Sequence, residues 1–336
     1  MQKSRRTLAI AIGLAAVGIA ASFLLYAGIR RIETAHASPS TELLDEIPAG
    51  APMLVYIDLA AIRASSFYQN RPDRAPIAIP DPNYKNFLQA TGFNFEKDLD
   101  RVVIAAWPQA LAQEQKKTVM VAEGRFDQQK IHDYAVKNGK VDHQQGRDVF
   151  LFSGRNPGDW NSFAFLDDQR IAMVEGSSIA PLLAPHAADS AADPARERAA
   201  HVSGAAAFVI TRIPPIPDNF APGGMQSQEL TSLLRSVQWV TLSTRPDGDN
   251  LRVSLEGECQ TSADARKLQS TLQTMFMFGR MGLESPKTRQ SMDPAAFEAL
   301  DTLLKAADIS ETAERVRILV EITPDIMKLS GPPKQH

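Results

Sequence analysis

The sequence predicts an α+β protein made of two tandem ferredoxin-like (β-α-β-β-α-β) units with antiparallel sheets, preceded by one N-terminal transmembrane helix. Three observations predict this fold class. Residues 7–29 are apolar and uncharged, short strand-like runs alternate with helix-like segments through the rest of the chain, and one order of elements occurs twice. At 336 residues, the chain is long enough for about two domains with separate cores.

The first element is the apolar run TLAIAIGLAAVGIAASFLLYAGI over residues 7–29. A helix of this length crosses a hydrocarbon core of about 30 Å. The basic residues within 1–6 predict a cytoplasmic tail, with the bulk of the chain outside. The competing interpretations are a buried core helix and a signal peptide cleaved after AHA at residues 35–37. The run is longer than a signal peptide needs, which favours an uncleaved signal anchor.

The first α+β domain is expected over residues 49–186, after a tether over 30–48. It opens with the strand MLVYIDL, a helical stretch and a loop that contains four prolines. The helix YKNFLQATG, the strands RVVIAAW and TVMVAEG, and a helix capped by Asp127 follow. Three further strands, DVFLFS, SFAFLD and RIAMVE, are separated by turn residues and predict an antiparallel meander.

The second α+β domain is expected over residues 204–330, after a linker over 187–203 and before a tail over 331–336. It repeats the order of the first: the strand AAAFVIT, a proline and glycine loop, the helix SQELTSLLRSV, and the strands QWVTLST and NLRVSLEGE around an Asp-Gly turn. A helix capped by Thr261 or Ser262, a second helix and the strand RVRILVEIT complete it. The repeated order suggests duplication and fusion.

A Glu-Gly pair recurs at Glu123, Glu175 and Glu256, each time where a strand is expected to give way to a helix. A single such glutamate would be a fair candidate for a catalytic base or a metal ligand. Its recurrence at equivalent places favours a topological role, with glycine for the sharp exit from the strand and glutamate as a solvated last residue near the next helix N-terminus.

No pattern in the sequence specifies a catalytic, cofactor or metal site. Gly-x-Gly-x-x-Gly, the phosphate-binding loop and Gly-x-Ser-x-Gly are absent, the six histidines are scattered, and Cys259 is the single cysteine. From residue 32 onward, 31 basic residues face 39 acidic ones, a net charge of about −8. This charge excludes a nucleic-acid partner, because phosphate binding needs a basic surface. We therefore expect no catalytic residue, cofactor or metal, and lean against an enzyme.

The candidate partner surface combines a methionine-rich helix with two proline-rich loops. The stretch TMFMFGRMG is apolar over more than one helix face, and methionine suits adaptable binding surfaces, although core packing is an alternative. The loops RPDRAPIAIPDP and PPIPDNFAPGG occupy equivalent places in the two halves. The residues proposed for this surface are Met275, Phe276, Met277, Phe278, Met281, Ile216, Phe220, Ile77 and Ile79.

The stretches LVYIDLAAIRAS, FNFEKDLDRVVIA and VAEGRFDQQKI together resemble a group of membrane-anchored bacterial envelope proteins that have no assigned activity. The resemblance covers mainly residues 50–180. It implies a bacterial source and an exported domain, and it supplies no functional residue. With residues 7–29 as anchor, it implies a single-pass protein of the bacterial inner membrane whose bulk is periplasmic or extracytoplasmic.

Three functions agree with these features. The leading hypothesis is an extracytoplasmic binding or scaffold protein that acts through contacts with an envelope protein. The second is an exported hydrolase or small-ligand-binding protein with a site between the two halves, which a pocket gathering Glu123, Glu256 or His132 would favour. The third is a structural subunit of a larger membrane complex, which would co-purify in fixed stoichiometry.

Overall fold

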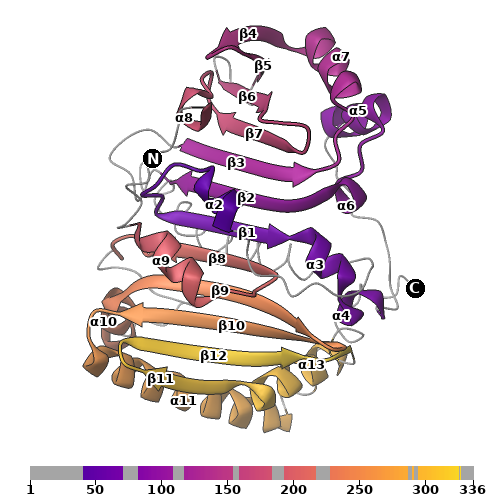
Figure 1. Ribbon diagram of the computed structural model, residues 1–336. Helices are drawn as coiled ribbons and strands as arrows, with labels where there is room; N and C mark the ends of the chain where they lie inside the picture. The colour runs from indigo at the N-terminus through magenta and orange to yellow at the C-terminus, as the bar shows by residue number, and fades with distance from the viewer. Residues whose placement is uncertain are drawn as a thin grey trace. The chain divides into compact units, whose positions relative to one another are not determined.

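Figure 1 shows the computed structural model of the chain. The structure describes residues 41–70, 82–108, 117–153, 159–183, 193–216, 228–286, 290, 294–324 and 326. The predicted cytoplasmic tail, transmembrane segment and C-terminal tail lie outside the described residues, as does most of the predicted tether. None of the helices within the described ranges is long and apolar enough to cross a membrane.

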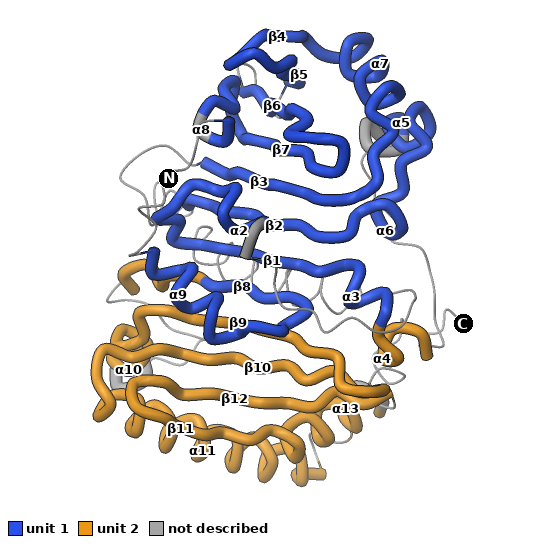
Figure 2. Tube along the Cα trace, in the orientation of Figure 1, with its two compact units in different colours: residues 1–64, 75–210 blue, residues 65–74, 211–336 orange. Residues whose placement is uncertain are grey.

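The chain divides into two compact units (Figure 2). Unit 1 comprises residues 1–64 and 75–210, and unit 2 comprises residues 65–74 and 211–336. The segment predicted to be a linker contains helix α9 (Pro194–His201), whose buried face includes Ala195 and Ala199. The end of the predicted tether forms helix α2 (Thr41–Asp45). Both helices belong to unit 1.

Unit 1 contains strands β1 to β7 and residues 207–210 of β8, in the order β8-β1-β2-β3-β7-β6-β5-β4. Every neighbouring pair from β1 to β4 in this order is antiparallel. The strands are β1 (Met53–Asp58), β2 (Leu99–Trp107), β3 (Lys117–Gly124), β4 (Lys140–Gln144), β5 (Arg147–Ser153), β6 (Trp160–Phe165), β7 (Arg170–Glu175) and β8 (Ala207–Arg212).

Several strands of this sheet bury one face, because alternate residues of a strand point to the same side. In β1 these are Leu54, Tyr56 and Asp58, and Tyr56 stacks on Phe208 of β8 with ring centroids 5.2 Å apart. The helices of the unit are α2, α3 (Leu59–Ala64), α5 (Pro82–Thr91), α6 (Phe95–Asp98), α7 (Gln128–Asn138), α8 (Ala180–Leu183) and α9.

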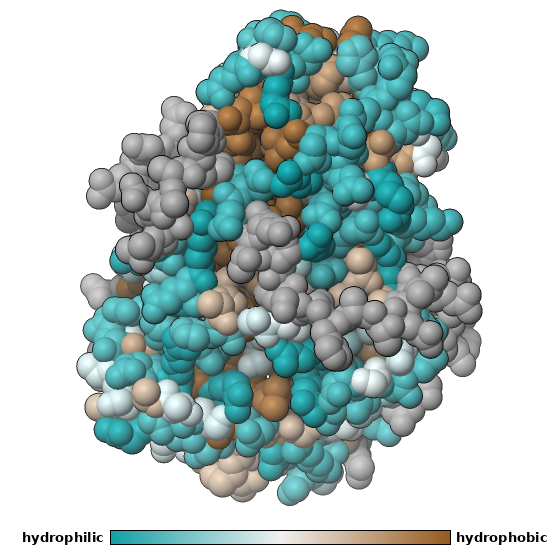
Figure 3. Space-filling view, viewed as in Figure 1, coloured by the Kyte–Doolittle hydropathy of each residue, from teal (hydrophilic) through white to brown (hydrophobic). Residues whose placement is uncertain are grey.

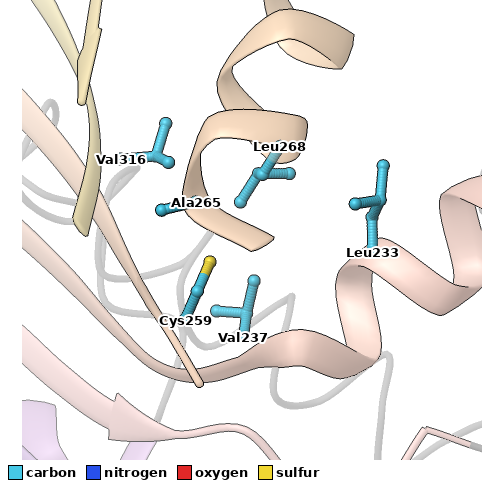
Figure 4. Close-up of a cluster of buried hydrophobic side chains, with 6 residues drawn as sticks. All are labelled: Leu233, Val237, Cys259, Ala265, Leu268 and Val316. Atoms are coloured by element: carbon cyan, nitrogen blue, oxygen red, sulfur yellow. The ribbon is translucent and has the colours of Figure 1, made fainter. Parts of the chain in front are cut away.

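Unit 2 contains the strands β9 (Val237–Asp247), β10 (Asn250–Cys259), β12 (Arg315–Ile322) and β11 (Asp308–Thr312), in this order. Their pairs are antiparallel. The helices are α4 (Ser66–Gln69), α10 (Gln228–Ser236), α11 (Ser262–Glu284) and α13 (Pro294–Ala306). Figure 4 shows one part of the core, in which Ala265 and Leu268 of α11 pack with Val237, Cys259, Val316 and Leu233.

The α+β class and the antiparallel pairing are as predicted, but the expectation of two ferredoxin-like sheets is wrong. The twelve strands within the described residues follow one another in a single sheet order. A split βαβ unit places another strand between its first two strands, whereas β1 pairs directly with β2. After β1 the chain returns as β2, which lies antiparallel beside β1, so no crossover connection is needed.

The same connectivity occurs in both halves of the chain. In the first half, a first, second and third strand lie side by side, and the last strand, β7, pairs with the third, β3. In the second half the first, second and third strands are β8, β9 and β10, and the last strand, β12, pairs with the third strand, β10. A long helix follows the third strand each time, α7 in one half and α11 in the other.

Candidate functional site

The methionine-rich stretch lies in the C-terminal half of α11, the longest helix of unit 2. Thr261 caps this helix, since its hydroxyl accepts a hydrogen bond from the backbone N–H of Asp264 at 3.1 Å. On its inner face, Ala265, Leu268 and Leu283 are buried. Residues at this spacing lie on one side of a helix, so α11 is anchored to its unit near both of its ends.

The opposite side of α11 carries large apolar side chains that face solvent. Met277, Phe278 and Met281 are 51%, 60% and 57% exposed. At 100° per residue they lie about 120–160° around the helix from Ala265 and Leu283, on the side away from the core. Met275 on α11 and Leu300 on α13 are further exposed apolar residues. We call Met277, Phe278 and Met281 the α11 patch.

The structure describes six of the nine residues predicted for the partner surface. Met275, Met277, Phe278 and Met281 are exposed on α11, and Phe276 is half-buried on the same helix. Ile216 is half-buried in a segment without regular structure, where its carbonyl accepts a hydrogen bond from Arg235 Nε at 3.2 Å. The loop residues Phe220, Ile77 and Ile79 lie outside the described residues.

A groove of about 420 Å³ adjoins the patch within unit 2. One wall consists of Phe276, Met277 and Met281 of α11, and the other is the short segment Ala307–Ile309 at the start of β11. Sequence reasoning missed the β11 wall, because the approach of this segment to α11 is a tertiary contact without a local signal in the sequence.

The three Glu-Gly glutamates do not form a common site. Glu123 is the next-to-last residue of β3 and pairs with Arg101 at 2.5 Å. Glu175 ends β7 and accepts a hydrogen bond from the hydroxyl of Thr118 at 2.9 Å. Glu256 lies inside β10 rather than at a strand end, which corrects the prediction. Strand β10 continues to Cys259 because Gly257 pairs with residues of both neighbouring strands.

A second hollow, of about 540 Å³, lies in unit 1 beside Glu123. Most of its charged side chains have ionic partners: Glu123 pairs with Arg101, and Arg170 pairs with Asp167 and Glu46, each at 2.5 Å. Burial raises the pKa of Asp167, but hydrogen bonds from Arg170 and from the backbone of Gln169 outweigh it and lower that pKa overall. These charges are arranged as structural ion pairs.

The remaining candidate groups are also structural. His132 is on α7, and its ring lies against the ring of Phe150. His143 is on β4, and its Nδ1 lies 3.0 Å from Oδ1 of Asp148. Burial raises the pKa of the Cys259 thiol, which disfavours a nucleophilic thiolate. Across the described residues, no group of three or more histidine, cysteine or acidic side chains is placed to hold a metal ion.

Asp58 is a buried carboxylate that the sequence did not single out. It is 7% exposed at the end of β1 and accepts a hydrogen bond from the backbone N–H of Ala61 at 2.7 Å, which caps α3. Burial raises its pKa above the ordinary value near 3.8, although the Ala61 hydrogen bond and the charge of Arg101 act in the opposite direction. Its position assigns it to the helix cap.

The raised pKa of Asp58 predicts a pH dependence of stability. Between the ordinary pKa and the raised one, the native state binds more protons than the unfolded state, so the free energy of unfolding falls as pH rises through that window. Asp58→Asn keeps a hydrogen-bond acceptor for Ala61 and removes this titration. Urea unfolding from pH 3.5 to pH 7 should therefore show a smaller decline for the variant, and parallel curves would contradict the assignment.

The polarity of the surface of unit 2 differs between the strands and helix α11. Along β10 and β12, Arg252, Glu256 and Arg317 point to one face of the sheet, and Arg315 pairs with Glu256 and Glu258 at 3.5 Å. Hydrophilic colours predominate over the strands of unit 2 in the view of Figure 3. An apolar surface on the outer side of α11 therefore contrasts with a charged strand face.

Comparisons with known proteins give a limited result. No family model and no curated protein matches the sequence. Among solved structures, the chain is similar to TP0453 in its crystal forms I, IV and III, with TM-scores of 0.41, 0.44 and 0.42 and sequence identities of 11%, 10% and 11%. The matches cover 88%, 85% and 85% of this chain and 98%, 94% and 96% of those chains. A likeness this distant bears on neither function nor partners.

Proposed function

We propose that this chain is a membrane-anchored, extracytoplasmic binding or scaffold protein of the bacterial inner membrane, which acts through contacts with an envelope protein. The single observation that carries the proposal is the outward side of α11. Met277, Phe278 and Met281 are each more than half exposed, while the inner side of the same helix already anchors unit 2. Exposed apolar side chains gathered in this way mark interaction surfaces.

Methionine and phenylalanine suit this role. Methionine side chains are flexible and polarizable, so they adapt to a partner, and the aromatic ring of Phe278 offers a large contact area. The charge outside residues 1–31, about −8, supports a protein partner rather than a nucleic acid. The anchor at residues 7–29 would keep the surface close to the membrane on its outer side.

The duplication remains part of the proposal. We infer that the two halves arose from one ancestral unit with the connectivity β-α-β-β-α followed by a returning strand. The shared sheet order of the two halves supports this inference. After the third strand, the second half has the patch-bearing helix α11, of 23 residues, where the first half has α7, of 11 residues, so the partner surface would be an acquisition of one half.

Photo-crosslinking in cells tests the binding surface. A benzophenone amino acid at Phe278 is expected to form a discrete protein adduct. The same amino acid at Lys267, on the exposed polar part of α11, serves as the matched control and should form none. Met277→Ser and Met281→Ser together should lower the adduct yield at position 278 at least tenfold without changing the Tm of the purified chain.

Two outcomes would contradict the proposed surface. The first is an absence of protein adducts from position 278, and the second is an equal yield from positions 278 and 267. A fall in Tm of several degrees in the double serine variant would instead assign these methionines to the core. That result would revive the packing interpretation of the stretch.

A further inference from the structure

Strand β11 is an open edge next to the groove of unit 2. It is the terminal strand in the sheet order and pairs only with β12 among the described strands. Figure 1 shows α11 running alongside it. An edge strand presents unpaired backbone groups that an extended peptide can use, so the direction of the β11 backbone groups decides what the groove can accept.

The register of the hairpin fixes those directions. Thr312 and Arg315 close a two-residue turn, and alternate residues of an antiparallel pair exchange both backbone hydrogen bonds. Ser310 and Asp308 therefore bond to β12, whereas Ile309 and Glu311 direct their N–H and C=O groups outward. The side-chain amides of Gln269 and Gln273 lie 3.4 and 3.5 Å from the Ile309 carbonyl, on that outward side.

These glutamine contacts are longer than a usual N–H···O hydrogen bond of about 2.9 Å. They satisfy an open edge weakly, and a backbone N–H from an added strand would replace them with better geometry. The carbonyl of the added strand would accept the outward N–H of Ile309 or Glu311. Strand addition of this kind takes its affinity from main-chain hydrogen bonds and its specificity from pockets for alternate side chains.

The groove supplies such a pocket. Successive side chains of an added strand point to opposite faces of the sheet, and those on the helix side would meet Phe276, Met277 and Met281, which line the groove. Apolar residues at every second position of the peptide would therefore be buried. This spacing distinguishes a strand-like ligand from a helical one, whose apolar residues recur every three or four positions.

The charge around the groove sets the second requirement. Its lining contains the exposed acids Asp308 and Glu284 and one cation, Arg280, so the acidic groups outnumber the basic one. The guanidinium of Arg280 donates to the carbonyl of Leu304 at 2.9 Å. Helices α11 and α13 both end here, at Glu284 and Ala306. Helix C-termini favour cations. The nearby ammonium of Lys305 is paired with Asp301 at 2.7 Å, so the rim favours a basic ligand.

We propose that β11 and the adjoining groove bind an extended, basic peptide segment that alternates apolar with Lys or Arg residues and adds to the sheet as a further strand. This inference rests on the proposed function, because it names the kind of partner segment that the binding surface would recognise. Its specific claim is that backbone groups of Ile309 and Glu311 take part.

The probe for this proposal is a phage library of random twelve-residue peptides, selected on the full chain in detergent. The selected peptides are expected to carry net positive charge and apolar residues at every second position. Glu311→Pro removes an outward N–H and leaves the hydrogen bonds to β12 in place. Glu311→Ala is the matched comparison, and the proline variant should bind selected peptides at least tenfold more weakly than the alanine variant.

Gln273→Ala provides an independent readout with the opposite sign. It removes one of the two amides that compete for the Ile309 carbonyl, so selected peptides should bind about two- to threefold more tightly, even if the proline variant does not fold. Selection of no peptides, of acidic peptides or of peptides with helical spacing would overturn the inference. So would equal binding by the proline and alanine variants. If crosslinking at Phe278 persisted in that case, the proposed function would survive and the strand-addition inference alone would fail.

Discussion

Gly124→Ala is expected to destabilise unit 1 by about 2–3 kcal/mol, the cost of forcing extra volume into a packed site. A Cβ atom at this position would collide with the backbone carbonyl oxygen of Asp98 and lie 3.1 Å from the Cα of Leu99. The backbone cannot easily retreat, because the N–H of Arg125 donates to that same carbonyl at 2.7 Å and the N–H of Gly124 donates to Gln169. The Tm should fall by about 5–10 °C.

Gly257→Ala is the matched control from the second half of the chain. Both glycines follow a glutamate in the third strand of their half, but the nearest atom to a Cβ at position 257 is a methyl carbon of Val237 at 3.6 Å, an ordinary contact. Replacing this glycine in a strand interior should be neutral or stabilising by about 0.5–1 kcal/mol. Equal losses at the two positions would contradict this structural difference.

The two units can be followed separately by fluorescence. Trp107 and Trp160 belong to unit 1 and Trp239 to unit 2. In a Trp239→Phe background, the tryptophan signal therefore reports the unfolding of unit 1 alone. Gly124→Ala should shift this transition to lower urea concentration, whereas Gly257→Ala should leave it in place.

Phe208→Ala is expected to have the largest effect of all, a loss of about 3–5 kcal/mol from the free energy of unfolding. The side chain of Phe208 is fully buried and stacks on Tyr56, which is also fully buried. Removal of the Phe208 ring leaves a cavity beside Tyr56 that the surrounding side chains fill only in part. Urea unfolding followed by the tryptophan fluorescence of unit 1 would measure the loss.

Phe278→Ala is the matched comparison for Phe208→Ala. The same ring is deleted, but Phe278 is 60% exposed on the outer side of α11. Its truncation should change the free energy of unfolding by no more than about 0.5 kcal/mol, the usual range for a surface substitution. A loss above 2 kcal/mol at Phe278 would show that the α11 patch serves stability. The proposal of a binding surface, which rests on the exposure of this patch, would then be contradicted.

Much of the element order could be predicted from local pattern. The strand MLVYIDL, the capped helix after Asp127 and the hairpin at Asp247-Gly248 all follow from short-range chemistry, and the structure has β1, α7 and the β9–β10 turn at these places. Caps, turns and alternation act over a few residues, so the sequence carries them directly. The methionine-rich helix was found for the same reason.

The sheet order was not predictable in this way, because it depends on which strands meet. Both a split βαβ arrangement and the observed order agree with the same run of strands and helices. Likewise, only the packing of α11 decided that Leu283 is buried while Met277 and Met281 face solvent. The groove beside β11 needs residues from two elements that are more than twenty positions apart in the chain.

The Glu-Gly pairs show which properties follow from the sequence and which follow from tertiary packing. By itself, the sequence determined that a glutamate and a glycine recur in strands, and it predicted a topological rather than catalytic role. Only the tertiary structure decided that Gly124 is tightly enclosed while Gly257 has room, and that Glu123 and Glu256 have separate ionic partners in Arg101 and Arg315. The physical reason is that local propensity depends on near neighbours in sequence, whereas steric space and ion pairing depend on which distant segments pack together.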